Sequence, residues 1–305
     1  KQRHIPSVSK NSSYHHGFPS CGVLAAAASV FITSSGSVFC DNDADDWEMS
    51  EEEKEELLHP EFLSPMSPLK FVLLASTGNG KSATGNYLLD PTEEHIFDKQ
   101  TFPTGETSIS CTSTCNIQSH PSGVVVLDTP GINESHSKDL GHMIGVVQKL
   151  KEMKHANAVI LVKKYDSRID QPWRESVLYY KQLMGDDAFN ANLIIVLTGP
   201  LESKRKLKAF GSRRQEKISQ TATEVQQLLG LKLPPCVFAV DTMPAGEPWD
   251  GDWVTQLRVR KEILRYASKQ RPAPVEDLRI PKTPILKQED EKEAKHLEGQ
   301  IEQLE

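Results

Sequence analysis

The most informative stretch of the sequence is residues 71–82, which read Phe71-Val72-Leu73-Leu74-Ala75-Ser76-Thr77-Gly78-Asn79-Gly80-Lys81-Ser82. The apolar run that opens this stretch predicts a strand covered on both faces. The glycine-rich part has the spacing of the phosphate loop GxxxxGK[ST], except that Ala75 stands at the first glycine position. A helical stretch from Ala83 to Leu89 follows. Strand, loop and helix in this order predict a loop whose backbone N–H groups surround phosphate oxygens.

The chemistry of such a loop assigns roles to its residues. The lysine reaches the outer phosphates, the serine hydroxyl binds Mg²⁺, and the helix N-terminus adds a partial positive charge. We therefore expect Lys81 to be catalytic and Ser82 to be a metal ligand. The expected nucleotide contacts are Thr77, Gly78, Asn79, Gly80, Lys81, Ser82 and Ala83.

A second element, Asp128-Thr129-Pro130-Gly131, directly follows the apolar run Val124 to Leu127. In P-loop NTPases an aspartate at this strand end holds Mg²⁺, and in the GTPases among them the glycine N–H contacts the γ-phosphate. The alternative is an ordinary turn, since Pro-Gly suits a turn without any ligand. We expect Asp128 to be a metal ligand and Gly131 to contact the nucleotide.

The rest of the chain alternates between strand-like and helix-like patterns. Further apolar runs are 158–162, 193–197 and 236–240, and helical spacing appears between them, at 140–150 and 218–229. This alternation predicts an α/β fold: a mostly parallel sheet with helices on both faces and ligands at the carboxyl ends of its strands. A Rossmann dehydrogenase is excluded, because its phosphate turn would lack Lys81 and Ser82.

Composition divides the chain into five segments. Residues 1–40 contain no acidic residue and predict a disordered or presequence-like N-terminus, and residues 41–68 form an acidic spacer. Residues 69–271 are the nucleotide-binding domain, and 272–284 are a proline-rich linker. The spacing of Ala294, Leu297, Ile301 and Leu304 predicts a coiled-coil-like helix over 285–305, with an ordinary exposed terminal helix as the alternative.

The bulk properties limit the partners and the compartment. The net charge of −7 argues against a general nucleic-acid binder. The five cysteines are odd in number and contain no CxxC pair, which predicts free thiols in a reducing compartment. No apolar run reaches the roughly 18 residues that span a bilayer. We therefore predict a cytoplasmic protein, with an organellar presequence in 1–40 as the alternative.

A family resemblance rests on the residues already quoted. The stretch Ser76 to Leu89, STGNGKSATGNYLL, and the segment Asp128 to Gly131 resemble the AIG-type, immunity-associated GTPases, relatives of septins and of the chloroplast import receptor GTPases. The resemblance covers about Leu69 to Ala267. It implies a P-loop GTPase fold that binds GTP or GDP with Mg²⁺, slow intrinsic hydrolysis and nucleotide-dependent self-association.

The resemblance also implies roles for residues outside these two motifs. The switch hydroxyl that binds Mg²⁺ falls near Ser110. Glu202 occupies the place of the aspartate that reads guanine, while Pro200 replaces the lysine that precedes it. Asp241 lies where the family supplies backbone contacts to the base. Arg168 resembles the arginine of a family box and could act as an arginine finger toward a partner's nucleotide, or be a solvated loop residue.

Three functions fit these observations. The first is a slow GTPase that assembles when it holds the triphosphate. The second is a degenerate scaffold that holds nucleotide without turnover, favoured by Ile132 in place of a catalytic glutamine and by Pro200. The third is an ATP-using P-loop protein. A basic cluster at 204–214 could meet a membrane surface or an acidic partner, or be a solvated insertion, and the C-terminal helix could have a coiled-coil partner.

Overall fold

The computed structural model describes residues 49–105, 114–131, 136–199, 204–244 and 247–275, together with Leu278 and Lys292. The predictions for residues 1–40, Ser110 and Glu202 lie outside this part of the chain. So does the predicted C-terminal helix, apart from Lys292. The domain limits proposed from composition therefore stay predictions.

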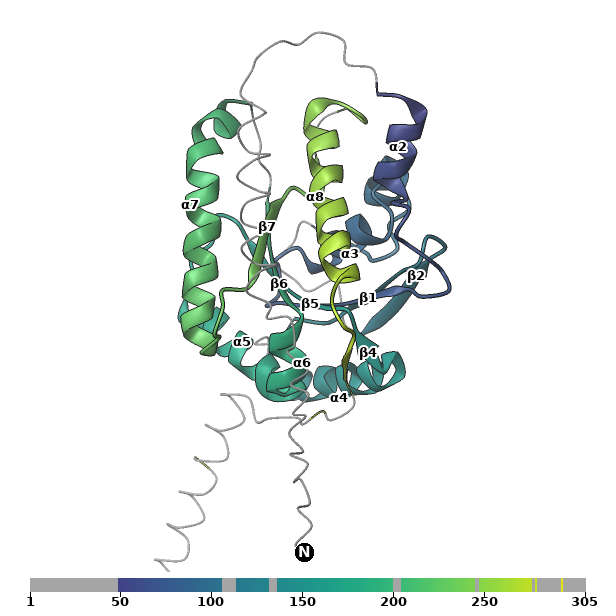
Figure 1. Cartoon of the computed structure of the whole chain (residues 1–305). Helices are drawn as coiled ribbons and strands as arrows, with labels where there is room; N and C mark the ends of the chain where they lie inside the picture. Colours follow the sequence, from purple (N-terminus) through teal and green to yellow (C-terminus); the bar gives the residue numbers. More distant parts are fainter. Residues whose placement is uncertain are drawn as a thin grey trace, which may run out of the picture. The chain divides into compact units, whose positions relative to one another are not determined.

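Strands and helices alternate through the described chain (Figure 1). The strands are β1 Leu69–Leu74, β2 Asn116–His120, β3 Val124–Asp128, β4 His155–Ala156, β5 Ala158–Lys164, β6 Leu193–Thr198, β7 Cys236–Val240 and β8 Ala273–Pro274. The helices are α2 Glu51–Leu58, α3 Lys81–Leu89, the π-helical turn η1 Glu94–Asp98, α4 His136–Met153, α5 Gln171–Met184, α6 Asp186–Ala191, α7 Lys204–Leu229 and α8 Gly251–Ser268.

The main sheet has the order β2-β3-β1-β5-β6-β7. β1 is parallel to both of its neighbours, β3 and β5, and the chain passes from β1 to one side of the sheet and then to the other. The carboxyl end of β1 is therefore a topological switch point, where open α/β sheets bind ligands. The predicted α/β fold with a mostly parallel sheet is confirmed.

Both faces of the sheet are covered, as the apolar runs predict. In β1 the side chains alternate, so that Val72 and Leu74 pack in one core cluster with α4, α5, α6 and α7. Phe71 and Leu73 pack in the other, with α2, α3 and α8. All four side chains are fully buried, which explains why the strand sequence is continuously apolar rather than alternating.

The strand β2 was not among the predicted strands. It pairs antiparallel with β3 at the edge of the sheet, with Asn116 opposite Asp128. Its sequence, NIQSH, contains one apolar residue, and its side chains are only partly buried or exposed. An edge strand of this kind lacks the apolar run from which the other strands could be predicted.

The described parts of the acidic spacer and of the proline-rich linker contain regular structure. Within the spacer, Ser50 and Glu53 form a capping box that starts α2, and Leu57 is buried in the core. Within the linker, β8 pairs with β4, and Val275 is 1% exposed. Both segments thus contain residues that pack against the domain. A few apolar side chains are enough to anchor each segment, while its charged side chains remain at the surface.

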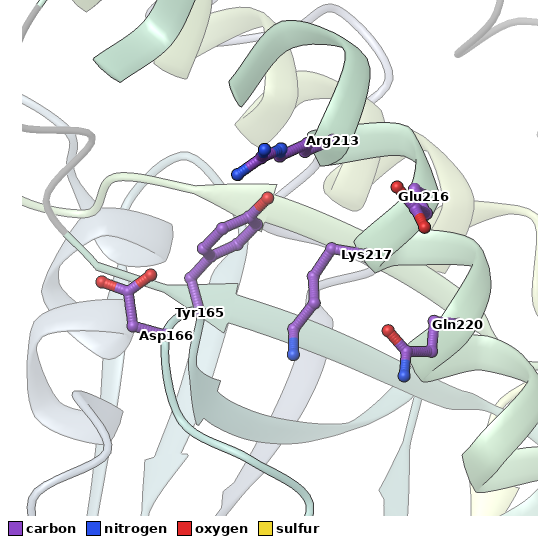
Figure 2. Close-up of a pocket in the computed structure, with 6 residues that line it drawn as sticks. All are labelled: Tyr165, Asp166, Arg213, Glu216, Lys217 and Gln220. Atoms are coloured by element: carbon purple, nitrogen blue, oxygen red, sulfur yellow. The ribbon is translucent and has the colours of Figure 1, made fainter. Parts of the chain in front are cut away.

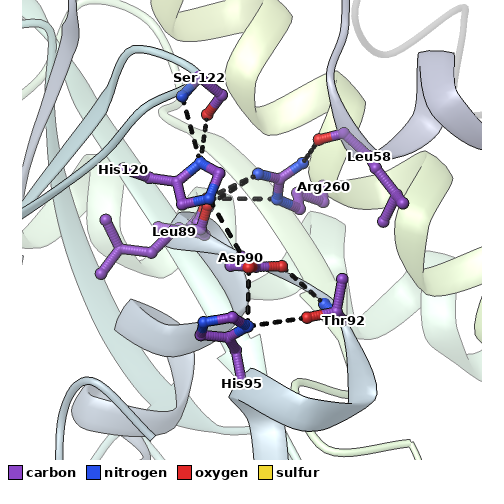
Figure 3. Close-up of polar contacts among 9 residues, drawn as sticks. Leu58, Leu89, Asp90, Thr92, His95, His120, Ser122 and Arg260 are labelled. Atoms are coloured by element: carbon purple, nitrogen blue, oxygen red, sulfur yellow. Dashed lines mark hydrogen bonds and ion pairs between the residues drawn. The ribbon is translucent and has the colours of Figure 1, made fainter. Parts of the chain in front are cut away.

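Arg260 of α8 joins the ends of two other helices (Figure 3). Its side chain is 0% exposed. It donates to Leu58 O at 2.9 Å, to Leu88 O at 3.2 and 2.9 Å, and to Leu89 O at 3.3 Å. A cation at helix carbonyls is favoured by the helix dipole, and the planar guanidinium reaches several acceptors at once. Arg260 therefore fixes the C-terminal ends of α2 and α3.

The structure also describes one buried thiol and the apolar character of the helices. Cys115 is a free thiol, and burial raises its pKa to about 12. Among the described residues, no helix combines the length and the apolar character that crossing a membrane requires.

Candidate functional site

The phosphate loop joins β1 to α3, which begins at Lys81, two residues before the predicted helical stretch. Gly78 and Gly80 have φ of 78° and 83°, a region that side chains rarely occupy. A Cβ at Gly80 would also lie 3.0 Å from Thr198 Oγ1. The Lys81 ammonium crosses the loop and donates to Ala75 O at 3.3 Å and Ser76 O at 3.4 Å. The loop thus has the closed form that surrounds a phosphate.

The predicted metal ligands Ser82 and Asp128 meet at the carboxyl end of β3. Ser82 Oγ donates to Asp128 Oδ2 at 2.7 Å, although the two residues are 46 positions apart. Asp128 is 1% exposed. A hydroxyl and a carboxylate are the hard oxygen ligands that suit Mg²⁺. The residues therefore fit the ion, and the third predicted ligand, Ser110, lies outside the described residues.

Gly131 lies directly against the phosphate loop. A Cβ at this position would stand 2.1 Å from Thr77 Oγ1 and 2.6 Å from Thr77 N, so only glycine fits. Thr129 supports the approach, because its hydroxyl donates to Leu73 O at 2.7 Å. The structure thus brings Gly131 beside the phosphate loop, and its contact with a nucleotide stays a prediction.

Asn79 links the loop to two neighbouring strands, and sequence reasoning did not find this network. Thr198 Oγ1, at the end of β6, donates to Asn79 O at 2.9 Å. Lys164 N, at the end of β5, donates to Asn79 Oδ1 at 3.2 Å, and Asn79 Nδ2 donates to Ser76 O at 3.1 Å. Contacts across 85 and 119 positions leave no periodic signal in the sequence.

The base side of the site is partly described. Asp241 follows β7 at the predicted edge, but its amide donates to Gln256 Oε1 at 3.0 Å and its carboxylate accepts from Met243 N at 3.0 Å. The amide thus joins the end of β7 to α8, the carboxylate stabilises the turn that follows, and the predicted contact of Asp241 with a base stays a prediction. Glu202 lies outside the described residues, so the base-reading prediction stays open.

Arg168 is exposed on the turn between β5 and α5. The same turn supplies Tyr165 and Asp166 to a cleft of about 310 Å³, whose opposite wall is α7 with Arg213, Glu216, Lys217 and Gln220 (Figure 2). The Tyr165 hydroxyl points toward Arg213 in this view. Burial raises the pKa of Tyr165. None of the described residues of the phosphate loop lines this cleft, so it is a separate hollow at the same edge of the sheet.

The residues after the loop lysine also have a structural role that the motif alone does not reveal. Asn86 is 2% exposed, and its side chain exchanges two hydrogen bonds of 2.8 Å with the backbone of Phe102. Gly85 packs so closely that a Cβ would lie 2.7 Å from Phe102 Cδ2. The pair fixes the segment that leads toward residues 106–113, where the switch hydroxyl is expected.

The chain is similar to known proteins in sequence. Residues 69–228, just over half of the chain, match the AIG1 family. Immune-associated nucleotide-binding protein 4 of Arabidopsis thaliana is 28% identical over 236 residues, covering 68% of this chain and 69% of that protein.

Solved structures of Arabidopsis Toc33 are also similar. A dimerization-deficient mutant of Toc33 has 16% identity and a TM-score of 0.47, covering 68% of this chain and 88% of its own. Toc33 in complex with GDP and Mg²⁺ has 17% identity and a TM-score of 0.45, covering 69% and 88%.

Proposed function

The chain belongs to the AIG1 family, and on that premise we propose that its G domain binds GTP and GDP with Mg²⁺, hydrolyses GTP slowly and self-associates. The observation that carries the proposal is the 2.7 Å contact between Ser82 Oγ and Asp128 Oδ2 beside the Lys81 loop. A phosphate loop, a lysine and a pair of metal ligands at one strand edge are the parts that phosphoryl transfer needs. The name of the Arabidopsis relative, a nucleotide-binding protein, supports nucleotide binding.

The catalytic contribution of the chain is electrostatic. Lys81 is held over the loop by two carbonyl groups, where its ammonium would contact the outer phosphates of a bound nucleotide and stabilise their developing charge. Loop amides and the N-terminus of α3 add donors and partial positive charge. Ser82 and Asp128 would hold Mg²⁺, which when bound neutralises charge on the phosphate oxygens. The absence of a glutamine after Gly131 leaves the attacking water without that orienting group, so turnover should be slow.

Arg168 supplies the proposed link between hydrolysis and self-association. It is exposed at the same edge of the sheet as the phosphate loop. An arginine supplied from a second copy would stabilise the transition-state charge that Lys81 alone does not cover. Turnover per molecule should therefore rise with protein concentration.

Equilibrium binding of fluorescent GDP tests the nucleotide. Unlabelled GTP and GDP should compete, ATP should not, and Lys81→Ala should lose binding. Lys151→Ala is the matched control, since Lys151 is an exposed lysine in the last turn of α4. Equal competition by ATP would overturn guanine preference and show that Glu202 does not replace the missing aspartate.

Turnover at several protein concentrations tests hydrolysis. We expect slow Mg²⁺-dependent GTP hydrolysis whose rate per molecule increases with concentration and is reduced by Arg168→Ala. Arg271→Ala should leave the rate unchanged, since Arg271 is an exposed arginine whose carbonyl accepts from Asn192, at the amino end of β6 and far from the phosphate loop. Nucleotide binding without any turnover would favour the scaffold function instead.

Two further partners belong to the same proposal as predictions. A coiled-coil partner would bind the helix predicted for 285–305, and an acidic membrane surface would bind the basic cluster near the start of α7. A cytoplasmic location is also part of the proposal.

A further inference from the structure

Lys163 is the second-last residue of β5, just before the turn that leads to α5. It is buried, with an exposed fraction of 1%. Its ammonium donates to Ser167 O and Ser167 Oγ in two short contacts, and to Lys164 O at 3.4 Å. Removing an ammonium group from water is costly unless it is hydrogen-bonded. Here all three acceptors belong to one tight turn, so the lysine stabilises the shape of residues 164–167.

That turn is connected to the nucleotide site on both sides. Lys164 N donates to Asn79 Oδ1 of the phosphate loop at 3.2 Å, and Tyr165 N donates to Thr198 O of β6. Ser167 closes the turn, because its hydroxyl donates to Lys164 O at 2.8 Å and its amide to the same oxygen at 3.2 Å.

Arg168 follows immediately after this turn. Beyond it, Asp170 caps α5 by accepting from Trp173 N at 3.1 Å, and the intervening Ile169 packs against the core. The chain is therefore anchored on both sides of Arg168, whose side chain is exposed.

We propose that Lys163 is a positioning residue, which holds the 164–167 turn against the phosphate loop. This turn holds Arg168 so that its side chain extends outward, where a second copy of the chain would bind. The effect on hydrolysis rests on the proposed function, whereas the effect on the turn does not. No motif of the nucleotide site includes Lys163, which acts from inside the fold.

The charge state of Lys163 matters for this role. Burial, together with repulsion from Lys217, lowers the pKa of Lys163 to about 8, while Asp170 and Glu224 oppose the shift. An ammonium has three N–H donors for the three acceptors, whereas a neutral amine has two donors and directs a lone pair at the third. The turn should therefore loosen as the pH rises above about 8.

Amide hydrogen exchange tests the geometry without any assumption about catalysis. In Lys163→Met, which keeps a long apolar side chain, we expect the Tyr165 and Ser167 amides to exchange at least about tenfold faster, while β6 amides stay protected. Lys164→Met is the matched control, since Lys164 is exposed and contributes backbone contacts that the substitution keeps. Unchanged exchange at residues 165 and 167 in Lys163→Met would overturn the proposal.

A double-mutant cycle tests the action through Arg168. Lys163→Met should reduce the concentration-dependent part of GTP turnover to the level of Arg168→Ala, with GDP affinity changed less than about threefold, and the double mutant should be no slower. Independent, multiplicative losses would mean that Lys163 does not act through Arg168. If the wild-type protein shows no Arg168-dependent turnover, that part of the proposed function fails, and the exchange result alone decides the role of Lys163.

The pH profile separates positioning from simple stability. The Arg168-dependent rate should fall as the pH rises through about 8, and this transition should be absent in Lys163→Met. A transition of the same size in both proteins would contradict the proposal.

Discussion

Replacing Arg260 by methionine should destabilise the domain without removing any nucleotide contact. Methionine fills similar space, but it cannot donate to the carbonyls of Leu88, Leu89 and Leu58. Leu88 and Leu89 are 0% and 3% exposed, so water does not readily replace the lost donors.

The expected change in the free energy of unfolding is the difference between two effects, the loss of hydrogen bonds and the removal of a buried charge. Each buried acceptor that is left without a donor costs about 1–3 kcal/mol, and two lie at the C-terminal end of α3. Removing a fully buried charge recovers part of this cost, because the guanidinium no longer has to be desolvated. Burial also lowers the pKa of Arg260 to about 10, which is a sign of that desolvation. We therefore expect a net loss of about 2–4 kcal/mol.

Urea unfolding followed by circular dichroism measures this loss. With a slope of about 3 kcal/mol per molar, the midpoint should fall by about 1 M. Arg271→Met is the matched control, since Arg271 is an exposed arginine, and its unfolding free energy should stay within about 0.5 kcal/mol of wild type. An Arg260→Met protein as stable as that control would refute the reasoning, because the desolvation term would then outweigh the three lost acceptor contacts.

Three further predictions concern packing, pH and the metal. Gly85→Ala should cost about 1–3 kcal/mol in urea unfolding, because its Cβ would lie 2.7 Å from Phe102 Cδ2 and the ring must move; an unchanged midpoint would contradict the packing. Burial lowers the pKa of His120 below its ordinary value of 6.5, so the unfolded chain takes up the proton first and stability should decrease as the pH falls below about 6.5. His120→Gln should flatten that decrease when unfolding is compared at several pH values, and an equal slope in both proteins would assign it to other groups. Ser82→Ala should weaken the Mg²⁺-dependent part of GDP affinity by about tenfold, or about 1.4 kcal/mol, measured by titration with and without Mg²⁺; equal Mg²⁺ dependence in wild type and variant would remove Ser82 from the metal site.

Local chemistry explains which parts of the site could be predicted. Lys81, Ser82 and their glycines lie within one short stretch, so their spacing alone predicts a loop around phosphate. Asp128 ends an apolar run, and parallel strands place their carboxyl ends at one edge, which is where Asp128 contacts Ser82 in the structure.

The supports of the site could not be predicted in this way. In the sequence, Arg260 has the position of an ordinary charged residue in an amphipathic helix. Lys163 has the position of a polar residue at the end of a strand. Both are buried because the carbonyl acceptors that surround them come from other segments or from a turn whose shape the sequence does not reveal.

Periodicity and short spacings are enough to predict the α/β alternation and the phosphate loop, and Ser82 and Asp128 stay predicted metal ligands that the fold brings into contact. Three features follow only from the folded chain: β2 joins the sheet edge, α2 packs on α8, and the ends of β5 and β6 hold Asn79. The physical reason is that a buried polar group is stabilised by whichever partner the fold brings within hydrogen-bond distance, and chain separation places no limit on that partner.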